Sequence, residues 1–165
     1  MRITRRDFVA LSLGTAGALV IGGRALYAAR GQAQRAPQAT LPPMTVYKSA
    51  TCGCCTGWVE HARTNGFTVR TVDTEDLGSV KRELGVPERL ASCHTVVVGA
   101  YVIEGHVPAM DVKRLLAERP DVRGLAVPGM PIGSPGMEQG PPSAYQRYDV
   151  LTFTRAGLTT VFARR

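Results

Sequence analysis

The 165-residue sequence lacks several features that mark common classes of protein. It contains no run of lysine or arginine, so its formal charge of +7 does not indicate a nucleic-acid surface. Five arginines and one aspartate give the first 33 residues a net charge of +4, which leaves only +3 for the rest. No Ser/His/Asp set, phosphate-binding loop, paired-carboxylate pattern or internal repeat stands out. These absences argue against the corresponding enzyme chemistries and against a nucleic-acid partner.

The sequence is also poor in cysteine, with four in total. In a domain of about 130 residues, four are too few for a fold held together mainly by disulfides. Their placement is more informative than their number, because Cys52, Cys54 and Cys55 fall within four positions. The fourth, Cys93, is followed directly by His94.

A long apolar run is absent as well. The longest near the N-terminus covers the 13 residues 9–21 and is shorter than the roughly 20 that a membrane span needs. It follows Arg5-Arg6 and Phe8, which together resemble a twin-arginine export signal. We therefore predict an export signal over 1–33, a Pro-bearing linker over 34–43 and one domain over 44–165. The expected location is the periplasm, and contact with the membrane is expected only where the leader stays uncleaved.

Hydrophobic periodicity and turn residues give the order of elements in the domain. The expected order is strand, helix, strand, helix, strand, strand, helix. A Gly/Pro-rich loop with Met130 and Met137 follows, and then a terminal hairpin. The strands are expected at 44–49, 67–72, 95–98 and 101–104, and those of the hairpin at 148–153 and 158–162. The helices are expected from the cysteine cluster to Gly66, from a cap at Asp73 or Thr74 to about Leu84, and over 109–118.

This order resembles the thioredoxin fold, which places a Cys-Gly-Pro-Cys turn between its first strand and first helix. Here Cys52-Gly-Cys-Cys55 stands in that turn, and His94 replaces the cis-proline that precedes the third strand. The resemblance implies an α/β fold, with a βαβαββα thioredoxin-like sheet and helices on both faces. The Gly/Pro/Met loop and the β-hairpin are additions at its C-terminal end. It also implies that Cys93 and His94 face the cysteine cluster.

Residues 44–163 further resemble a family of bacterial periplasmic proteins called CopG, some of which are encoded in copper-resistance operons. Four motifs carry this resemblance in order, namely Cys52-Gly-Cys-Cys55 with Trp58, Ser92-Cys-His-Thr95, Glu104-Gly-His-Val-Pro108, and the segment from Gly129-Met-Pro to Gly136-Met-Glu138. This resemblance implies copper binding and a redox role.

The chemistry of the cluster points the same way. Unpaired N–H groups and the dipole at a helix entry favour thiolate, so we expect lowered pKa values for Cys52 and Cys55. Soft sulfur ligands suit Cu(I), zinc or iron–sulfur centres. Because Cys54 and Cys55 are adjacent, they are better placed to bridge two ions than to bind one. This favours a multinuclear Cu(I)–thiolate cluster. Zinc is less favoured, because structural zinc sites use two spaced pairs of ligands.

The candidate metal ligands share soft or imidazole donors. They are Cys52, Cys54, Cys55, Cys93, His94, His106, Met130 and Met137. Each has a plainer alternative: Cys93 as a small buried hydrophobe, the histidines as hydrogen-bonded structural residues, and the methionines as packing. His61 is expected to be solvated, and Trp58 to belong to the core.

The sequence predicts a periplasmic copper(I)-binding protein of copper homeostasis or resistance. Its partners would be the metal ion and a periplasmic copper exporter or chaperone. Thiol oxidation coupled to copper reduction is a combined possibility, with Cys52 and Cys55 catalytic only if they are redox-active. The main alternative is a thioredoxin-like thiol–disulfide oxidoreductase, since Cys52 and Cys55 have the Cys-x-x-Cys spacing. A third possibility is a domain stapled by disulfides with no ligand. Whether the protein is an enzyme is left open.

Overall fold

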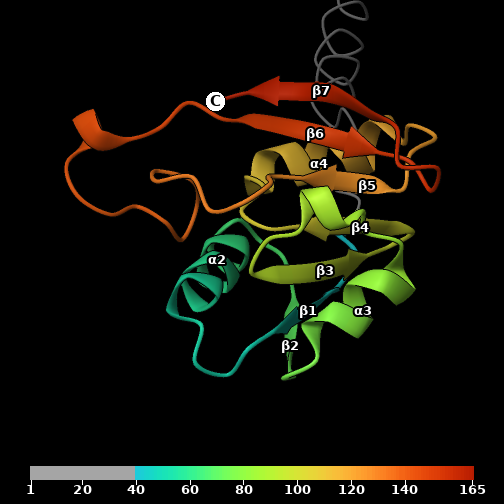
Figure 1. Cartoon of the computed structure of the whole chain (residues 1–165), viewed down its shortest axis with the longest axis horizontal. Helices are drawn as coiled ribbons and strands as arrows, with labels where there is room; N and C mark the ends of the chain where they lie inside the picture. The colour runs from blue at the N-terminus through green and yellow to red at the C-terminus, as the bar shows by residue number, and fades with distance from the viewer. Residues whose placement is uncertain (1–39) are drawn as a thin grey trace, which may run out of the picture. The chain divides into compact units, whose positions relative to one another are not determined.

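The computed structural model describes residues 40–165, and the predicted export signal and most of the predicted linker lie outside this range. Seven strands form one mixed sheet in the order β2-β1-β3-β4-β5-β6-β7. Figure 1 shows the sheet running from β2 near the bottom of the view to β7 at the top. Of the helices within 40–165, none has the length and apolar character needed to cross a bilayer.

The first half of the domain is a thioredoxin-like unit, as the sequence predicts. Its strands are β1 (Met44–Lys48), β2 (Val69–Asp73), β3 (His94–Val98) and β4 (Tyr101–Glu104). The strand β1 pairs in parallel with β2 and antiparallel with β3, which forms a hairpin with β4. The helices are α2 (Gly53–Thr64), α3 (Leu77–Leu84) and α4 (Ala109–Glu118), and a short 3-10 turn, η1, covers Glu88–Leu90.

The two faces of the sheet are covered by different helices. Trp58 and Val59 of α2 and Val112 and Leu115 of α4 share one core cluster with side chains such as Ile103. The opposite face carries a smaller cluster of buried side chains from the segment just after α3, from η1 and from the sheet, namely Val86, Leu90, Val102, Ala126 and Phe153. Alternate residues of β4 therefore enter opposite cores, as the period of a strand requires. The expected helices on both faces are present.

The second half extends the sheet. After α4 the chain forms β5 (Gly124–Ala126), which pairs in parallel with β4, and then the hairpin of β6 (Asp149–Phe153) and β7 (Thr159–Arg164). The sequence predicts the hairpin but misses β5, which it assigns to the Gly/Pro-rich loop. A three-residue strand followed closely by Pro128 has too few residues to show the alternation of a strand. A second 3-10 turn, η2, covers Pro142–Ala144.

The start of α3 also differs from the prediction. The cap is Asp76, whose carboxylate accepts a hydrogen bond from the Ser79 backbone N–H at 2.9 Å. Asp73 is instead the last residue of β2, where it pairs with Lys48 at 3.0 Å. Asp76, like the predicted Asp73 and Thr74, is a residue type that caps helices, so the sequence alone does not decide among these positions. The strand β2 differs from the prediction as well, because it begins at Val69, two residues later than predicted, and ends at Asp73.

Candidate metal centre

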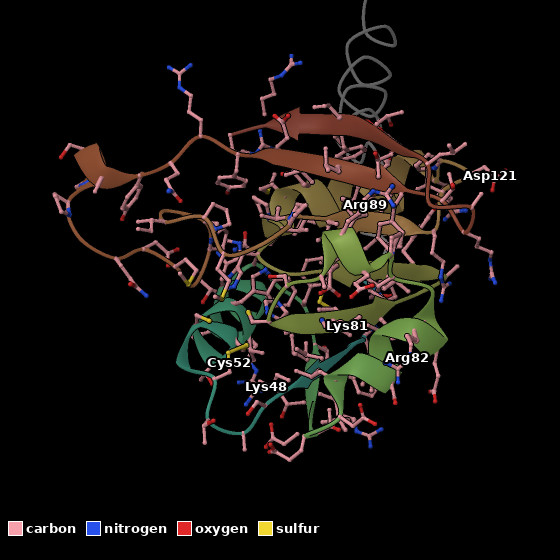
Figure 2. All side chains as sticks on the ribbon, viewed as in Figure 1. Lys48, Cys52, Lys81, Arg82, Arg89 and Asp121 are labelled. Carbon is pink, nitrogen blue, oxygen red and sulfur yellow. A yellow bond between two sulfur atoms is a disulfide. The ribbon has the colours of Figure 1, made fainter. Side chains whose placement is uncertain are left out.

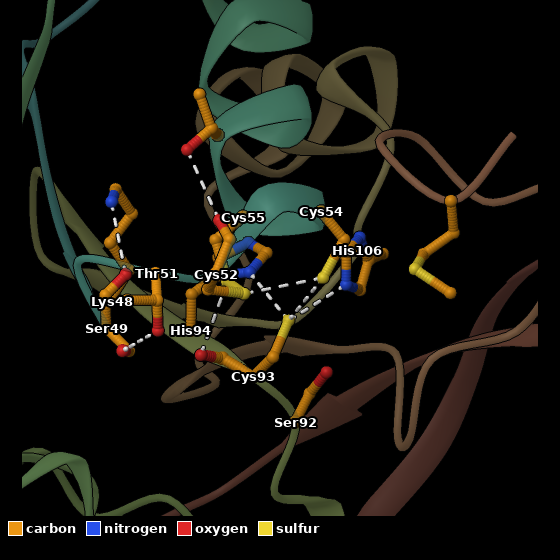
Figure 3. Close-up of a disulfide and its surroundings, with 12 residues drawn as sticks. Lys48, Ser49, Thr51, Cys52, Cys54, Cys55, Ser92, Cys93, His94 and His106 are labelled. Carbon is orange, nitrogen blue, oxygen red and sulfur yellow. Dashed lines mark hydrogen bonds between the residues drawn. A yellow bond between two sulfur atoms is a disulfide. The ribbon is translucent and has the colours of Figure 1, made fainter.

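The cysteine cluster lies at the N-terminus of α2. Cys52 is the N-cap residue without a side-chain capping bond, and Cys54 and Cys55 belong to the first turn. Cys52 and Cys55 are joined in a disulfide, whereas Cys54 and Cys93 are free. Cys55 is fully buried because it continues the apolar face of the helix, while Cys54 points to one side of it (Figure 3). The turn thus holds one oxidised pair and one free thiol.

The sheet brings the fourth cysteine to this turn. The register of β1 and β3 places Lys48 opposite His94, so β3 begins where β1 ends and the cysteine turn starts. Cys93 Sγ consequently lies 3.7 Å from Cys54 Sγ, and Cys54 Sγ lies 3.4 Å from Cys52 Sγ. The predicted meeting of the Cys93–His94 pair with the cluster is therefore present. The four sulfur atoms all lie within 4.8 Å of one another.

Two imidazoles complete the cluster on the side of Cys93. His94 Nδ1 lies 3.3 Å and His106 Nε2 3.0 Å from Cys93 Sγ, and both rings are fully buried. His106 Nδ1 donates to the backbone carbonyl of Pro135 at 2.8 Å, which leaves its Nε2 lone pair facing Cys93. His94 Nε2 has no hydrogen-bond partner, alone among the buried side-chain nitrogen and oxygen atoms of residues 40–165. Figure 3 shows the sulfur atoms and both rings converging.

Burial sets the protonation of these groups. Removal from solvent, and then the nearby Cys54, raises the pKa of the Cys93 thiol to about 12. Burial likewise places the pKa of His94 well below its usual range, and it lowers the pKa of His106. At neutral pH the centre thus holds a neutral thiol beside neutral imidazoles, which are the forms that give up a proton or donate a lone pair to a metal.

The Gly/Pro-rich loop covers the turn. Gly136 has φ +83°, and a Cβ there would lie 2.5 Å from the Cys54 carbonyl oxygen, so this loop approaches the backbone of α2 closely. Met137 directly follows that contact and is 8% exposed. Met130 lies at an outer part of the loop with 51% of its side chain exposed. Of the two methionines, Met137 is the buried one, and it directly follows the residue that contacts α2.

His61 is placed differently from the prediction of a solvated side chain. Its Nε2 accepts a hydrogen bond from the Ala109 backbone N–H at 3.0 Å, so it satisfies the first turn of α4. Burial lowers its pKa, which keeps it neutral for that role. Trp58, by contrast, is a core residue as predicted. Its ring centroid lies 4.9 Å from that of His94, and its indole N–H donates to Val107 O at 2.9 Å.

Among residues 40–165, two groups of side chains have the donors and the spacing of a metal site. One consists of the four cysteines, and the other of Cys93, His94 and His106. They share Cys93, so they form one continuous sulfur and imidazole centre at the end of the sheet. This fold and this centre define a thioredoxin-like protein with a cysteine-rich site able to bind a soft metal.

Comparison with known proteins agrees with this class. Residues 90–137 match the model of a family described as "Protein of unknown function, DUF411". Two solved structures, named "Copper resistance protein copG" forms 1 and 2, are each 45% identical to the chain. Their TM-scores are 0.70 and 0.71, and the alignments cover 76% of this chain and 98% of theirs. No curated protein matches the sequence. The chain belongs to the CopG family of copper resistance proteins.

Proposed function

We propose that the protein binds copper(I) in its reduced state and serves copper resistance in the periplasm. The single observation that carries this proposal is the convergence of four cysteine sulfurs and two imidazoles at the N-terminus of α2. Its relatives of solved structure are named for copper resistance and are 45% identical to it in alignments that cover 76% of this chain.

The donor chemistry fits Cu(I) well. Thiolate and imidazole are preferred ligands of this ion, and a thioether such as that of Met137 is a further soft donor. His94 Nε2 is buried without a hydrogen bond, and this usually costs about 1–3 kcal/mol. A fold that tolerates this cost is consistent with selection for the imidazole as a ligand. The adjacent thiols of Cys54 and Cys55 favour sulfur bridges between ions, and hence a multinuclear cluster.

The disulfide suggests how thiol redox would couple to copper. Loss of two electrons and two protons from the Cys52–Cys55 dithiol forms the S–S bond, and the two electrons reduce two Cu(II) ions to Cu(I). Cys54, Cys93, His94 and His106 remain in the form that binds the product. In this reaction copper is the substrate, and an external reductant of the dithiol or thioredoxin type would restore Cys52 and Cys55.

A second candidate function is thiol–disulfide exchange with other proteins, favoured by the Cys-x-x-Cys disulfide itself. Exchange requires an accessible sulfur, and Cys52 is the more exposed member of the pair whereas Cys55 is buried. Reduction of insulin by the reduced protein tests this candidate. Inert behaviour, together with copper uptake, would leave copper binding as the function.

Export by the twin-arginine route and delivery of copper to a periplasmic exporter or chaperone belong to the same proposal. The Arg5-Arg6 pair and the apolar run after it support export, and a fusion of residues 1–43 to a reporter tests the route. Loss of export when both arginines become lysine is the expected result.

Metal analysis of anaerobically purified, reduced protein tests the copper proposal. We expect more than one Cu(I) per chain, and a lower content in C54S with the fold retained. H61Q is the matched control, because His61 binds a backbone N–H of α4 and should leave copper uptake unchanged. Zinc in place of copper, or equal copper in C54S and the parent protein, would contradict the proposal.

A further inference from the structure

A buried carboxylate lies behind the centre, on the other face of the sheet. Glu104, the last residue of β4, is fully buried. Its Oε1 accepts hydrogen bonds from Lys81 Nζ at 2.5 Å and from the Ser92 backbone N–H at 2.6 Å. Its Oε2 accepts one from the Thr95 hydroxyl at 2.7 Å. Figure 2 labels Lys81 where α3 lies against the sheet.

A buried carboxylate such as that of Glu104 calls for a functional explanation. Burial of a carboxylate is costly unless it is paired and fully hydrogen-bonded, and an apolar residue often serves stability equally well. Burial raises the pKa of Glu104, and the Lys81 ammonium with its hydrogen bond acts in the opposite direction. The strand around it is otherwise apolar, with Val102 and Ile103 in the two cores. Neither the thioredoxin-like sheet nor its two cores requires a charge at this position.

The partners of this carboxylate border the metal centre. Ser92 directly precedes Cys93, and His106 follows Glu104 by two residues. The two segments touch at Gly105, where an added Cβ would lie 2.5 Å from Ser92 Oγ. One carboxylate therefore joins the backbone before Cys93 to the strand that leads into His106.

The same junction also holds the covering loop. The Val127 N–H donates to the Glu104 carbonyl at 3.0 Å, and the Ser92 hydroxyl donates to the Gly129 carbonyl. Displacement of the Glu104 carboxylate would thus release two segments directly, the one with Cys93 and the end of β4 before His106, and would reach the Gly/Pro-rich loop only through the Ser92 hydroxyl.

We infer that Glu104, held by Lys81, is a positioning residue that sets the contact between Cys93 Sγ and His106 Nε2. It ligates nothing itself, because it lies on the opposite face of the sheet from the imidazoles. The consequence for copper affinity rests on the proposed function, whereas the consequence for Cys93 does not.

The test compares E104A and the conservative E104Q with a matched control, D111A. Asp111 is also a buried carboxylate paired with a cation, Arg165, but it lies on α4 and its partners are outside the centre. The metal-free readout is the rate of Cys93 alkylation by iodoacetamide. It is measured in a C54S background with the Cys52–Cys55 disulfide intact, where Cys93 is the one free thiol of the chain.

We expect E104A to speed alkylation several-fold, because release of the Ser92 backbone also frees the neighbouring Cys93 sulfur from its contact with His106 and exposes it to the reagent. We expect E104Q to stay near the parent rate and D111A to leave it unchanged at a similar loss of stability. In the full-cysteine protein, E104A should weaken Cu(I) binding by about 10–100-fold, the usual effect of losing a group that orients a ligand.

Equal alkylation in E104A and D111A, or no change in either, would overturn the inference. If E104A does not fold, K81M replaces it, because it removes the ammonium and keeps the carboxyl group. A folded K81M with unchanged alkylation would then be the contrary result. If the parent protein takes up no copper, the proposed function fails while the alkylation rates still decide the role of Glu104.

Discussion

Cys54 Sγ and Cys93 Sγ lie 3.7 Å apart although 39 positions separate them in the sequence. The contact continues a chain of soft atoms that begins at the Cys52–Cys55 disulfide and ends at His106 Nε2. The chain exists because the antiparallel pairing of β1 with β3 brings both segments to one end of the sheet. Its members therefore form one continuous set of donors.

Oxidation should control how much copper the protein holds. The disulfide removes two of the four sulfurs as thiolate ligands, so we predict that the oxidised protein binds fewer Cu(I) ions per chain than the reduced protein. Anaerobic titration against a Cu(I)-chelating competitor measures both capacities. The double variant C52S/C55S is the control, and its capacity should be low and independent of redox treatment. Equal capacities for oxidised and reduced parent protein would contradict this prediction.

His106 should contribute to affinity through its Nε2 atom. The Pro135 carbonyl fixes the ring so that this nitrogen faces Cys93, and H106Q removes it while keeping a polar side chain. We predict that Cu(I) affinity falls about tenfold or more, or at least ~1.4 kcal/mol. Competition titration of reduced H106Q and H61Q measures the difference. An equal loss in H61Q would indicate a general effect of replacing a histidine.

The close approach of the loop to α2 should make Gly136 hard to replace. We predict that G136A destabilises the apoprotein by about 1–2 kcal/mol for the left-handed backbone, and by about 1–3 kcal/mol more for the clash with α2. Gly129 is a matched control, because it has φ +69° but no atom within 4 Å of the added Cβ, so G129A should show only the first effect. Urea denaturation of both variants measures the free energies of unfolding. Equal values would mean that the loop yields to the added methyl group without cost.

The apoprotein should lose stability in mild acid. His94 has a folded-state pKa well below its ordinary value of about 6.5, so the unfolded chain binds the additional proton. The stability that this provides is full above about pH 6.5 and falls as the pH drops toward the folded-state pKa. The slope is at most about 1.4 kcal/mol per pH unit for one proton.

The measurement is the free energy of unfolding of metal-free protein between pH 5 and pH 8. H94Q should flatten the curve, whatever its effect on absolute stability. Some slope should persist in it, because burial also lowers the pKa values of His61 and His106. A curve as steep as that of the parent protein would show that His94 gains its proton in the folded state.

Local patterns in the sequence predict much of the fold. The helical spacing of Cys55, Val59 and Ala62 predicts α2, and all three side chains are buried in it. Two short strand-like runs at 95–98 and 101–104, joined by the two-residue turn Gly99-Ala100, predict the β3–β4 hairpin. The short β5 escapes prediction because its pairing with β4 and β6 depends on residues far away in the sequence.

The centre is predictable only in part. The thioredoxin-like order of elements is enough to bring Cys93 and His94 to the cysteine turn. The contact of Pro135 with His106 involves a backbone carbonyl, which every residue type has, so the sequence does not indicate it. Glu104 is detectable in the sequence as a charged residue in an otherwise apolar strand. Its partner Lys81 lies on another element, so the pairing itself could not be predicted. The metal roles of these residues stay predictions.

The position of Trp58 makes its intrinsic fluorescence a reporter of the centre. It is the chain's single tryptophan, so no second indole contributes to the fluorescence signal. Its ring lies beside His94, and its N–H is bonded to the residue that follows His106. Arrival of an ion, or a shift of either imidazole, therefore changes the surroundings of the fluorophore directly. Occupancy of the centre can be followed in the unlabelled protein, in real time and at micromolar concentration.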